Sequence, residues 1–248
     1  MTSVENLIVL APTFAIAYLV FALVGSGTTL ISAPIAAHIV PLPILVPAQA
    51  LLDLIASAGN GLKLIRQVNR EELIRLLVPM ILGLAVGTYL LLKIDVQVLM
   101  IVLGVFVVLY AIRGLLAHGQ KPLLSSRRAY WFGFSGGVLS ALFGAGAWLY
   151  AIYLTRRLES PQEIRATQTA LIAGGCVIRV VFFTIVGKYS DWTVIGLSIS
   201  LLPAMALGIY AGNRLAHRLN RTLFMRVLLF LLLVTGSSLI VRGVANIL

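Results

Sequence analysis

Long apolar runs alternate with short polar clusters along the whole chain. A transmembrane helix needs about 20 mainly apolar residues. Runs of this kind predict four spanning helices, at 73–92, 96–116, 192–211 and 222–240. Two more apolar runs, 44–65 and 164–187, contain polar residues, and the runs 7–40 and 129–155 do not divide simply into full spans. The pattern predicts a protein that crosses a membrane several times.

The composition points to the same environment. Of the 248 residues, 60% are hydrophobic and 11% are charged, and the mean hydropathy is +1.04. Charged residues make up about 25% of a typical soluble domain, so this chain lacks the polar surface that water requires. Residues 1–6 contain Glu5 and no basic residue, so we expect no cleaved secretory signal. The single Cys176 excludes a disulfide framework and a cysteine metal site.

The net charge of +11 has a topological explanation. Fifteen of the nineteen basic residues fall in four short stretches, at 63–75, 113–128, 156–165 and 214–226. Lys and Arg in short loops mark the cytoplasmic side of a membrane protein. The charge therefore calls for no nucleic-acid partner, and both termini are predicted to face outside.

These assignments restrict the number of crossings between the basic stretches. From 75 to 113 the chain must cross an even number of times, as two helices with a turn near Lys93 and Asp95 would do. The same holds from 165 to 214, with a turn near Lys188 and Asp191. Only 27 residues separate Arg128 from Arg156, too few for two full spans. This segment is predicted to be a re-entrant or partial hairpin.

The sequence also contains an internal repeat. A shift of 119 positions aligns 21–60 with 140–179 without a gap. The informative identical pairs are Gly25 with Gly144, Gly27 with Gly146, and Gln49 with Gln168. A shift of 125 aligns Gly83 and Gly87 with Gly208 and Gly212, and this spacing places two glycines on one helix face where another helix can approach closely.

The predicted topology orients the two halves in opposite senses. The run 44–65 ends at a cytoplasmic stretch, whereas its counterpart 164–187 begins at one. We therefore predict an all-α polytopic membrane protein with two inverted-topology repeats, 1–120 and 121–248. Each repeat is a broken or re-entrant helical hairpin followed by three transmembrane helices. In many secondary transporters such repeats place the substrate site near the midplane, at the repeat interface.

The matched glycine boxes are candidate parts of that site. Two glycines one residue apart let the backbone turn sharply and expose amide N–H groups, which attract anions at a helix start. Irregular backbone at membrane depth is tolerated where it is buried or lines a cavity. The candidate substrate-binding residues at the two interruptions are Gly25, Ser26, Gly27, Thr28, Gly144, Ala145, Gly146 and Trp148.

Asp53 and Arg179 are the charged residues that lie well inside predicted helices, and such residues are functional candidates. Arg179 offers a cationic donor fork suited to an oxyanion. Asp53 would repel an anion, so we assign it to proton coupling. The alternative is a buried ion pair between the two. Gln49, one helical turn before Asp53, and its counterpart Gln168 complete the candidate substrate-binding set.

These residues carry a family resemblance. The two Gly-x-Gly boxes, the stretch 133–137 leading to 142–146, and Pro161 followed by 166–169 resemble the sulfite exporter TauE/SafE family. The resemblance implies a bacterial inner-membrane permease that moves sulfite, sulfonates or related organosulfur anions outward, driven by the proton gradient. Members often have a third glycine after the box. Thr28 and Ala147 stand there in this chain, which leaves the shape of the hairpin tip and the substrate open.

Other functions remain as alternatives at this stage. Thiosulfate or a small carboxylate could use the same donors, whereas a cation transporter would need more intramembrane acids than Asp53. A non-transporting scaffold would explain the glycines but not the buried charges. The stretch 133–136 matches the Gly-x-Ser-Gly pattern of rhomboid proteases, but an intramembrane protease needs a histidine near Ser135. We predict no enzyme, catalytic residue, cofactor or metal, and the sequence leaves a homodimer open.

Overall fold

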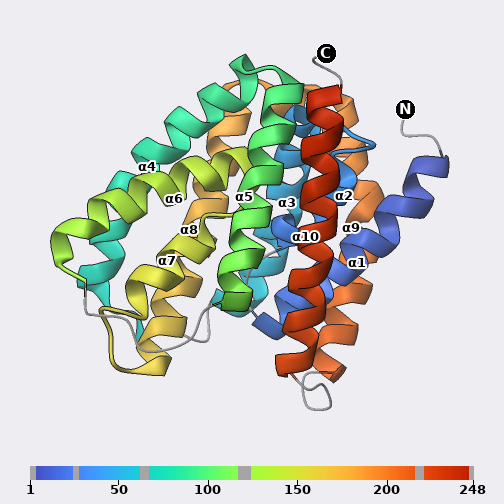
Figure 1. Cartoon of the computed structure of the whole chain (residues 1–248). Coiled ribbons are helices and arrows are strands. Elements are labelled where there is room, and N and C mark those ends of the chain that lie inside the picture. Colours follow the sequence, from blue (N-terminus) through green and yellow to red (C-terminus); the bar gives the residue numbers. More distant parts are fainter. Residues whose placement is uncertain (1–3, 25–27, 62–66, 117–123, 216–220, 246–248) are drawn as a thin grey trace.

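The computed structural model describes residues 4–24, 28–61, 67–116, 124–215 and 221–245 (Figure 1). Within these ranges the structure contains no strand, and its α-helices are α1 (Val4–Val24), α2 (Thr28–Ala36), α3 (Leu42–Gly61), α4 (Arg70–Lys93), α5 (Val96–Leu116), α6 (Ala129–Phe143), α7 (Ala147–Leu154), α8 (Pro161–Ile185), α9 (Trp192–Leu215) and α10 (Arg221–Ala245). The short 3-10 turns η2 (Ser126–Arg128) and η3 (Lys188–Ser190) precede α6 and α9. The all-α prediction is confirmed.

The long helices follow the apolar runs. Four of them, α4, α5, α8 and α9, are long and apolar enough to cross a bilayer, and α1, α3 and α10 contain shorter apolar stretches at 7–23, 42–57 and 229–245. The turn near Lys93 and Asp95 joins α4 to α5, and the turn near Lys188 and Asp191 joins α8 to α9, as predicted.

The segment from 129 to 155 forms a broken hairpin, as predicted. Helix α6 has 15 residues and spans about 22 Å, less than the roughly 30 Å of the bilayer core. It ends because Gly144 adopts a left-handed conformation with φ +64° and donates its N–H to the Ser140 carbonyl. Helix α7 has only 8 residues. In the first half the chain breaks between α1 and α2, where Gly25, Ser26 and Gly27 lie outside the described residues.

Helices α4 and α6 run side by side through small residues. A Cβ on Gly83 would overlap the Phe134 carbonyl oxygen, and a Cβ on Gly87 would lie 2.7 Å from the Val138 carbonyl oxygen. Real side chains do not approach backbone so closely, so only glycine allows this helix separation.

Helices α9 and α1 make a contact of the same kind. A Cβ on Gly208 would overlap the Ala15 carbonyl oxygen, and a Cβ on Gly212 would lie 2.6 Å from the Leu19 carbonyl oxygen. The predicted packing role of the matched glycines is therefore confirmed at two separate helix contacts.

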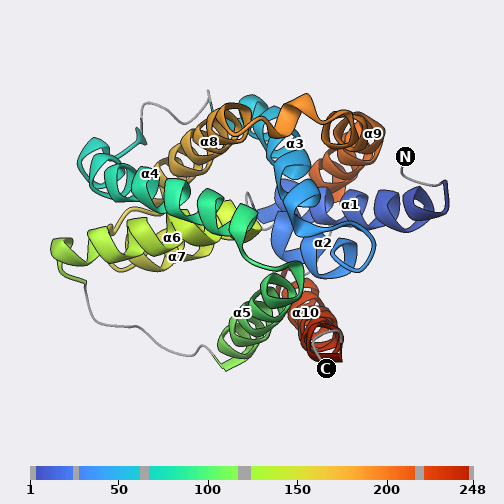
Figure 2. The same cartoon turned by 90° about the horizontal axis from the view of Figure 1, so that it is seen from above.

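The remaining helices pair within this frame. Seen from above, α4, α6 and α7 lie on one side, α1, α2 and α9 on the other, and α5 and α10 form a separate pair (Figure 2). A Cβ on Gly104 of α5 would lie 2.7 Å from the Gly236 carbonyl of α10, and Gly114 and Gly243 have their contacts at opposite ends of this pair, so α5 and α10 are antiparallel. Helix α3 contacts α8 and α9.

The polarity of the helices agrees with the charge pattern. Helices α4, α6 and α8 begin, and helices α5 and α9 end, at their lower ends in Figure 1, and these ends flank the four basic stretches. The first turn of α1 and the last turn of α10 lie toward the upper side (Figure 1). Which side faces the cytoplasm stays a prediction.

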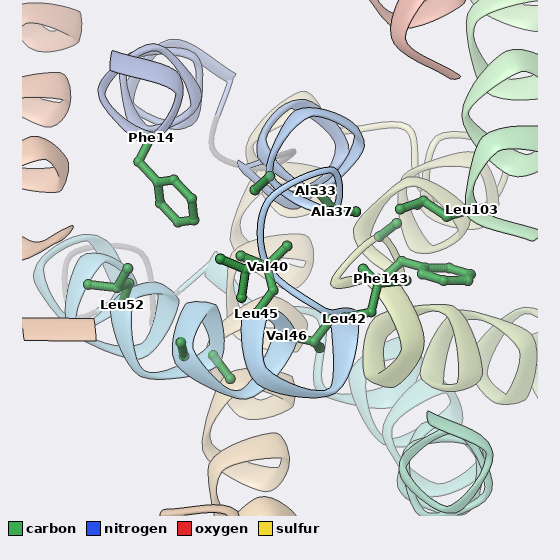
Figure 3. Packing of buried hydrophobic residues seen from close by; sticks show 14 of the residues in the cluster. Phe14, Ala33, Ala37, Val40, Leu42, Leu45, Val46, Leu52, Leu103 and Phe143 are labelled. Carbon is green, nitrogen blue, oxygen red and sulfur yellow. The ribbon is translucent and has the colours of Figure 1, made fainter. Parts of the chain in front are cut away.

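The apolar core surrounds the second and third helices. Phe14 of α1, Ala33 of α2, Leu52 of α3 and Phe143 at the end of α6 belong to one buried cluster (Figure 3). The end of the α6–α7 hairpin is thus packed into the same core as the first hairpin. This packing positions the end of α6 near the centre of the molecule.

Candidate functional site

Asp53 of α3 and Arg179 of α8 face each other in the middle of the molecule. The Nη1 atom of Arg179 lies 3.7 Å from Oδ2 of Asp53, and the two residues are 2% and 6% exposed. The buried ion pair that the sequence left as an alternative is therefore present. A buried pair costs desolvation of both charges, and removing one partner leaves an uncompensated charge.

The other carboxylate oxygen of Asp53 has two hydroxyl donors. Tyr18 of α1 and Thr28 at the start of α2 each donate to Oδ1 at 2.9 Å. Thr28 was predicted from its place after the glycine box. Tyr18 was not, because an aromatic residue in an apolar helix gives no sign of the direction in which its hydroxyl points.

Arg179 is only partly satisfied. Its Nη2 atom donates to the Val46 carbonyl at 3.4 Å, a long contact, and its Nε atom has no hydrogen-bond partner among the described residues. A guanidinium has five donors. Donor capacity therefore remains beside the ion pair.

Further polar groups nearby are buried without partners. The Thr29 and Tyr150 hydroxyls and the Gln49 side-chain nitrogen have no hydrogen-bond partner in the described part of the chain. The Gln49 side-chain oxygen accepts from Ser32 at 3.0 Å, so only its donor end is free. Unsatisfied buried groups are few in native structures and each calls for an explanation. Here most can donate, which suits an anionic ligand.

A small cavity lies between Asp53, Tyr150 and Arg179. Its volume is about 30 Å³, and its lining includes Phe21, Thr28, Asp53, Gly144, Tyr150 and Arg179. A cavity needs about 10–15 Å³ of such space to hold one water, so this one has room for about two waters and must widen to admit an oxyanion with several heavy atoms. Cys176 also lines the cavity and is 4% exposed. The single thiol of the chain thus lies beside the candidate site.

The second glycine box brings the two hairpins together. A Cβ on Gly144 would overlap the hydroxyl oxygen of Thr29, and the positive φ of Gly144 also favours glycine. A Cβ on Gly146 would overlap the Gly136 carbonyl oxygen, so α7 lies close against α6. Ala145 between them is 2% exposed. The box thus allows close approach at both of its glycines.

Of the predicted residues that the structure describes, Thr28, Asp53, Gly144 and Arg179 line the cavity, and the others do not. Trp148 packs edge-on against Phe106 and Tyr110 of α5, with ring centroids 6.0 and 5.2 Å apart, and the Arg113 guanidinium lies 5.9 Å from its ring centre. Gln168 is half-buried near the start of α8 and does not line the cavity. Its repeat counterpart Gln49 does not line the cavity either, but it is fully buried, a difference that the match in the repeat did not reveal.

A second polar cluster, which the sequence did not reveal, ties α4 to α7. Glu72 is 3% exposed and accepts from the Tyr153 hydroxyl at 2.7 Å, from Arg157 Nε at 2.8 Å and from Arg75 Nη1 at 2.9 Å. The hydrogen bond and the charge of Glu72 raise the pKa of Arg157. Glu72 lies in the first turn of α4, three residues after the capping residue Asn69. Acidic residues are common at that position, so nothing in the sequence indicated that Glu72 is buried.

The serine-protease alternative finds no support in the geometry. Ser135 donates its hydroxyl to the Trp131 carbonyl of its own helix. His38 contacts Arg242 at 2.9 Å and Ser238 at 3.4 Å on α10. The other two histidines, His118 and His217, lie outside the described residues.

Comparison with known proteins agrees with the membrane architecture. A family model described as sulfite exporter TauE/SafE matches residues 10–239. The chain is also similar to the "Probable inner membrane transporter protein TsaS" of Comamonas testosteroni, with 28% identity over 191 residues, which cover 76% of this chain and 80% of that protein. No solved structure matches the chain. The family and this relative indicate a membrane transporter rather than an enzyme. Because the model covers nearly every described helix, the chain belongs to the sulfite exporter TauE/SafE family.

Proposed function

We propose that this protein is a secondary transporter of the bacterial inner membrane that exports sulfite, a sulfonate or a related small organosulfur anion. The observation that carries the proposal is the buried Arg179, which lines a cavity and whose Nε atom has no hydrogen-bond partner among the described residues. An anion that leaves water needs a fixed positive charge and hydrogen-bond donors in its place. Arg179 supplies the charge, and Gln49, Thr29 and the hairpin amides supply dipoles.

The proposed scaffold is a pair of inverted repeats, 1–120 and 121–248. Its support is the exchange of contacts between halves: Gly83 of α4 meets Phe134 of α6, and their repeat counterparts, Gly208 and Ala15, meet each other as well. The helices α5 and α10, which are counterparts, pair with each other in antiparallel fashion. A two-fold axis in the membrane plane would produce both features, with the site at the midplane where α3 meets α8.

The proposed coupling uses competition for Arg179. In the empty site Arg179 pairs with Oδ2 of Asp53, whose Oδ1 already accepts from Tyr18 and Thr28. An arriving anion binds Arg179 in place of Asp53. The substrate and the Asp53 carboxylate would then be two negative charges beside one buried cation, which is unfavourable. Asp53 then binds a proton at Oδ2 while the anion is bound.

The direction of coupling follows from this linkage. A proton that binds with the anion moves with it, so acid on the side of the anion accelerates transport. This differs from the sequence expectation of export driven by the inward proton gradient, because on this scheme export follows the anion's own gradient. The cavity of about 30 Å³ must widen toward one side at a time. The contact between Thr29 and Gly144, where the hairpins meet, is the proposed place of that opening.

The test is flux into proteoliposomes. Radiolabelled sulfite, an alkyl sulfonate, thiosulfate and acetate are supplied outside at pH 6 and pH 8 with a fixed interior pH. We expect saturable uptake of the sulfur oxyanions that is faster at acid pH. The Arg165→Gln variant, which changes an exposed arginine of α8, serves as control and keeps the flux. Absence of saturable flux for every anion in the panel would refute the proposed function.

A further inference from the structure

Tyr150 of α7 is the unpartnered cavity residue that the proposed mechanism does not use. The residue is 2% exposed, lines the cavity with Arg179, and has no hydrogen-bond partner for its hydroxyl in the described part of the chain. A buried tyrosine hydroxyl normally has a partner, because leaving it unpaired costs its full desolvation. A ligand oxygen in the cavity would supply that partner.

The fold holds the Tyr150 ring in place through a glycine. A Cβ on Gly136 would overlap the ring at Cε1, so α6 makes room for the ring by having no side chain there. Glycine inside a helix lowers stability relative to alanine. Gly146 in turn lies against the Gly136 carbonyl, which fixes α7 on α6. The hydroxyl is therefore presented to the cavity by a rigid support.

Comparison with two other residues indicates that the Tyr150 hydroxyl is not needed for packing. Tyr153, one turn later on the same helix, donates its hydroxyl to Glu72 at 2.7 Å, so the other buried tyrosine of α7 is satisfied within the protein. The repeat counterpart of Tyr150 is Ile31, which is 2% exposed. An apolar side chain therefore serves the matched position, and packing alone does not require a hydroxyl.

We infer that Tyr150 is a specificity-determining contact that donates to the third oxygen of an R–SO₃⁻ group while Arg179 holds the other two. The inference rests on the proposed function. A guanidinium binds two oxygens in its own plane. A carboxylate has no further oxygen, whereas a sulfonate or sulfite has a third one directed out of that plane. A donor from α7, on a different element from Arg179 of α8, is placed to meet it.

The selectivity follows from the unpaired donor. When a carboxylate fills the site, the Tyr150 hydroxyl stays buried without a partner, and sites built to pair a polar group discriminate strongly against ligands that leave it unpaired. The class selected is therefore three-oxygen sulfur anions over carboxylates of the same charge and size.

The experiment compares methanesulfonate with acetate, which share a methyl group and a single negative charge. Calorimetry on purified wild type, Tyr150→Phe and Tyr153→Phe gives both affinities. We expect Tyr150→Phe to weaken methanesulfonate binding at least about tenfold and acetate binding by no more than about twofold. Tyr153→Phe removes a buried hydroxyl from the same helix but lies outside the cavity, so the ratio of the two affinities stays at the wild-type value.

A second measurement works in membranes without purification. The widened site that admits an anion also admits N-ethylmaleimide to Cys176, so protection of Cys176 from alkylation by increasing methanesulfonate reports occupancy of the same cavity. Tyr150→Phe should raise the half-protecting concentration at least about tenfold. An unchanged ratio of affinities, or an equal loss for both anions, overturns the role of Tyr150 while wild-type binding of methanesulfonate leaves the proposed function standing. If the wild type binds neither methanesulfonate nor sulfite, the proposed function itself fails and the inference falls with it.

Discussion

The contact of α4 with α6 is built from the same positions of the repeat as the contact of α9 with α1. The polar site at the centre of the molecule lacks this correspondence between the two halves. At the two outer contacts, glycines at matching positions meet carbonyl groups at matching positions. At the centre, the ion pair and the two tyrosines have unlike counterparts under the shift of 119: Asp53 corresponds to Ile172, Arg179 to Asn60, Tyr18 to Gly137 and Tyr150 to Ile31, whereas Gln49 keeps its match in Gln168.

The difference has a physical reason. Close helix packing in a bilayer depends on small residues, and both halves need it equally. A small anion needs one compensating charge. A second arginine within a cavity of about 30 Å³ would add repulsion and desolvation that no ligand of single charge could offset. The packing glycines are therefore the same in both halves. The charged residues and tyrosines of the candidate site each occur in one half only.

The largest effect is expected from Arg179. Arg179→Gln removes the charge and should abolish measurable anion binding, and Arg179→Lys keeps the charge but loses the fork, so affinity should fall about tenfold or more. Calorimetry with methanesulfonate checks both. The double variant Asp53→Asn with Arg179→Gln removes the ion pair and should fold yet not bind. Wild-type affinity in the double variant would show that Arg179 serves only to pair with Asp53.

The next effect concerns the pH dependence of transport. Asp53→Asn keeps the two hydroxyl partners but removes the competing charge, so methanesulfonate binding should persist and become independent of pH. Flux into proteoliposomes should no longer accelerate on the acid side. In the wild type, affinity should rise as the pH falls, because proton and anion bind together. If flux through Asp53→Asn still depended on pH, the coupled proton would have to bind at a residue other than Asp53.

The glycine contacts offer a direct test of their equivalence. Gly83→Ala and Gly208→Ala each force a Cβ onto a carbonyl oxygen and should lower stability by about 1–3 kcal/mol. Thermal melting in detergent should show similar losses for both. Gly196→Ala on α9 is the matched control, since its Cβ has nothing within 4 Å, and it should be neutral or slightly stabilising. Unequal losses would weaken the equivalence of the two contacts.

The smallest effect is expected at Glu72, which lies outside the glycine contacts and the cavity. Glu72→Gln leaves Arg157 without its charge partner, while Arg75 keeps its ion pair with Glu71, and both arginines are about a third exposed and screened by solvent. We expect a loss of about 1 kcal/mol with methanesulfonate affinity unchanged. A change in affinity beyond the melting shift would connect this cluster to the site.

Local patterns in the sequence predicted much of the architecture. The helices, the broken hairpin after Phe143 and the packing glycines all follow from features within about 25 residues. The two intramembrane charges were also evident, because a charge in an apolar run is costly and therefore rare. The resemblance to the family rested on the same glycine boxes and agrees with the family match over 10–239.

The sequence by itself determined the set of membrane elements, the places where they break, and Asp53 and Arg179 as intramembrane charges. Each segment must meet the bilayer's limits on length and polarity, so these features can be recognised from one segment at a time. The tertiary structure decided which groups meet. It paired Arg179 with Asp53, brought the Tyr18 hydroxyl to Asp53 and Tyr150 to the cavity, buried Glu72, and placed Trp148 against α5. These outcomes depend on which helices pack together across the two halves and on how each side chain is rotated toward its neighbour. Contacts between α3 and α8, more than a hundred residues apart, have no signature in either segment alone.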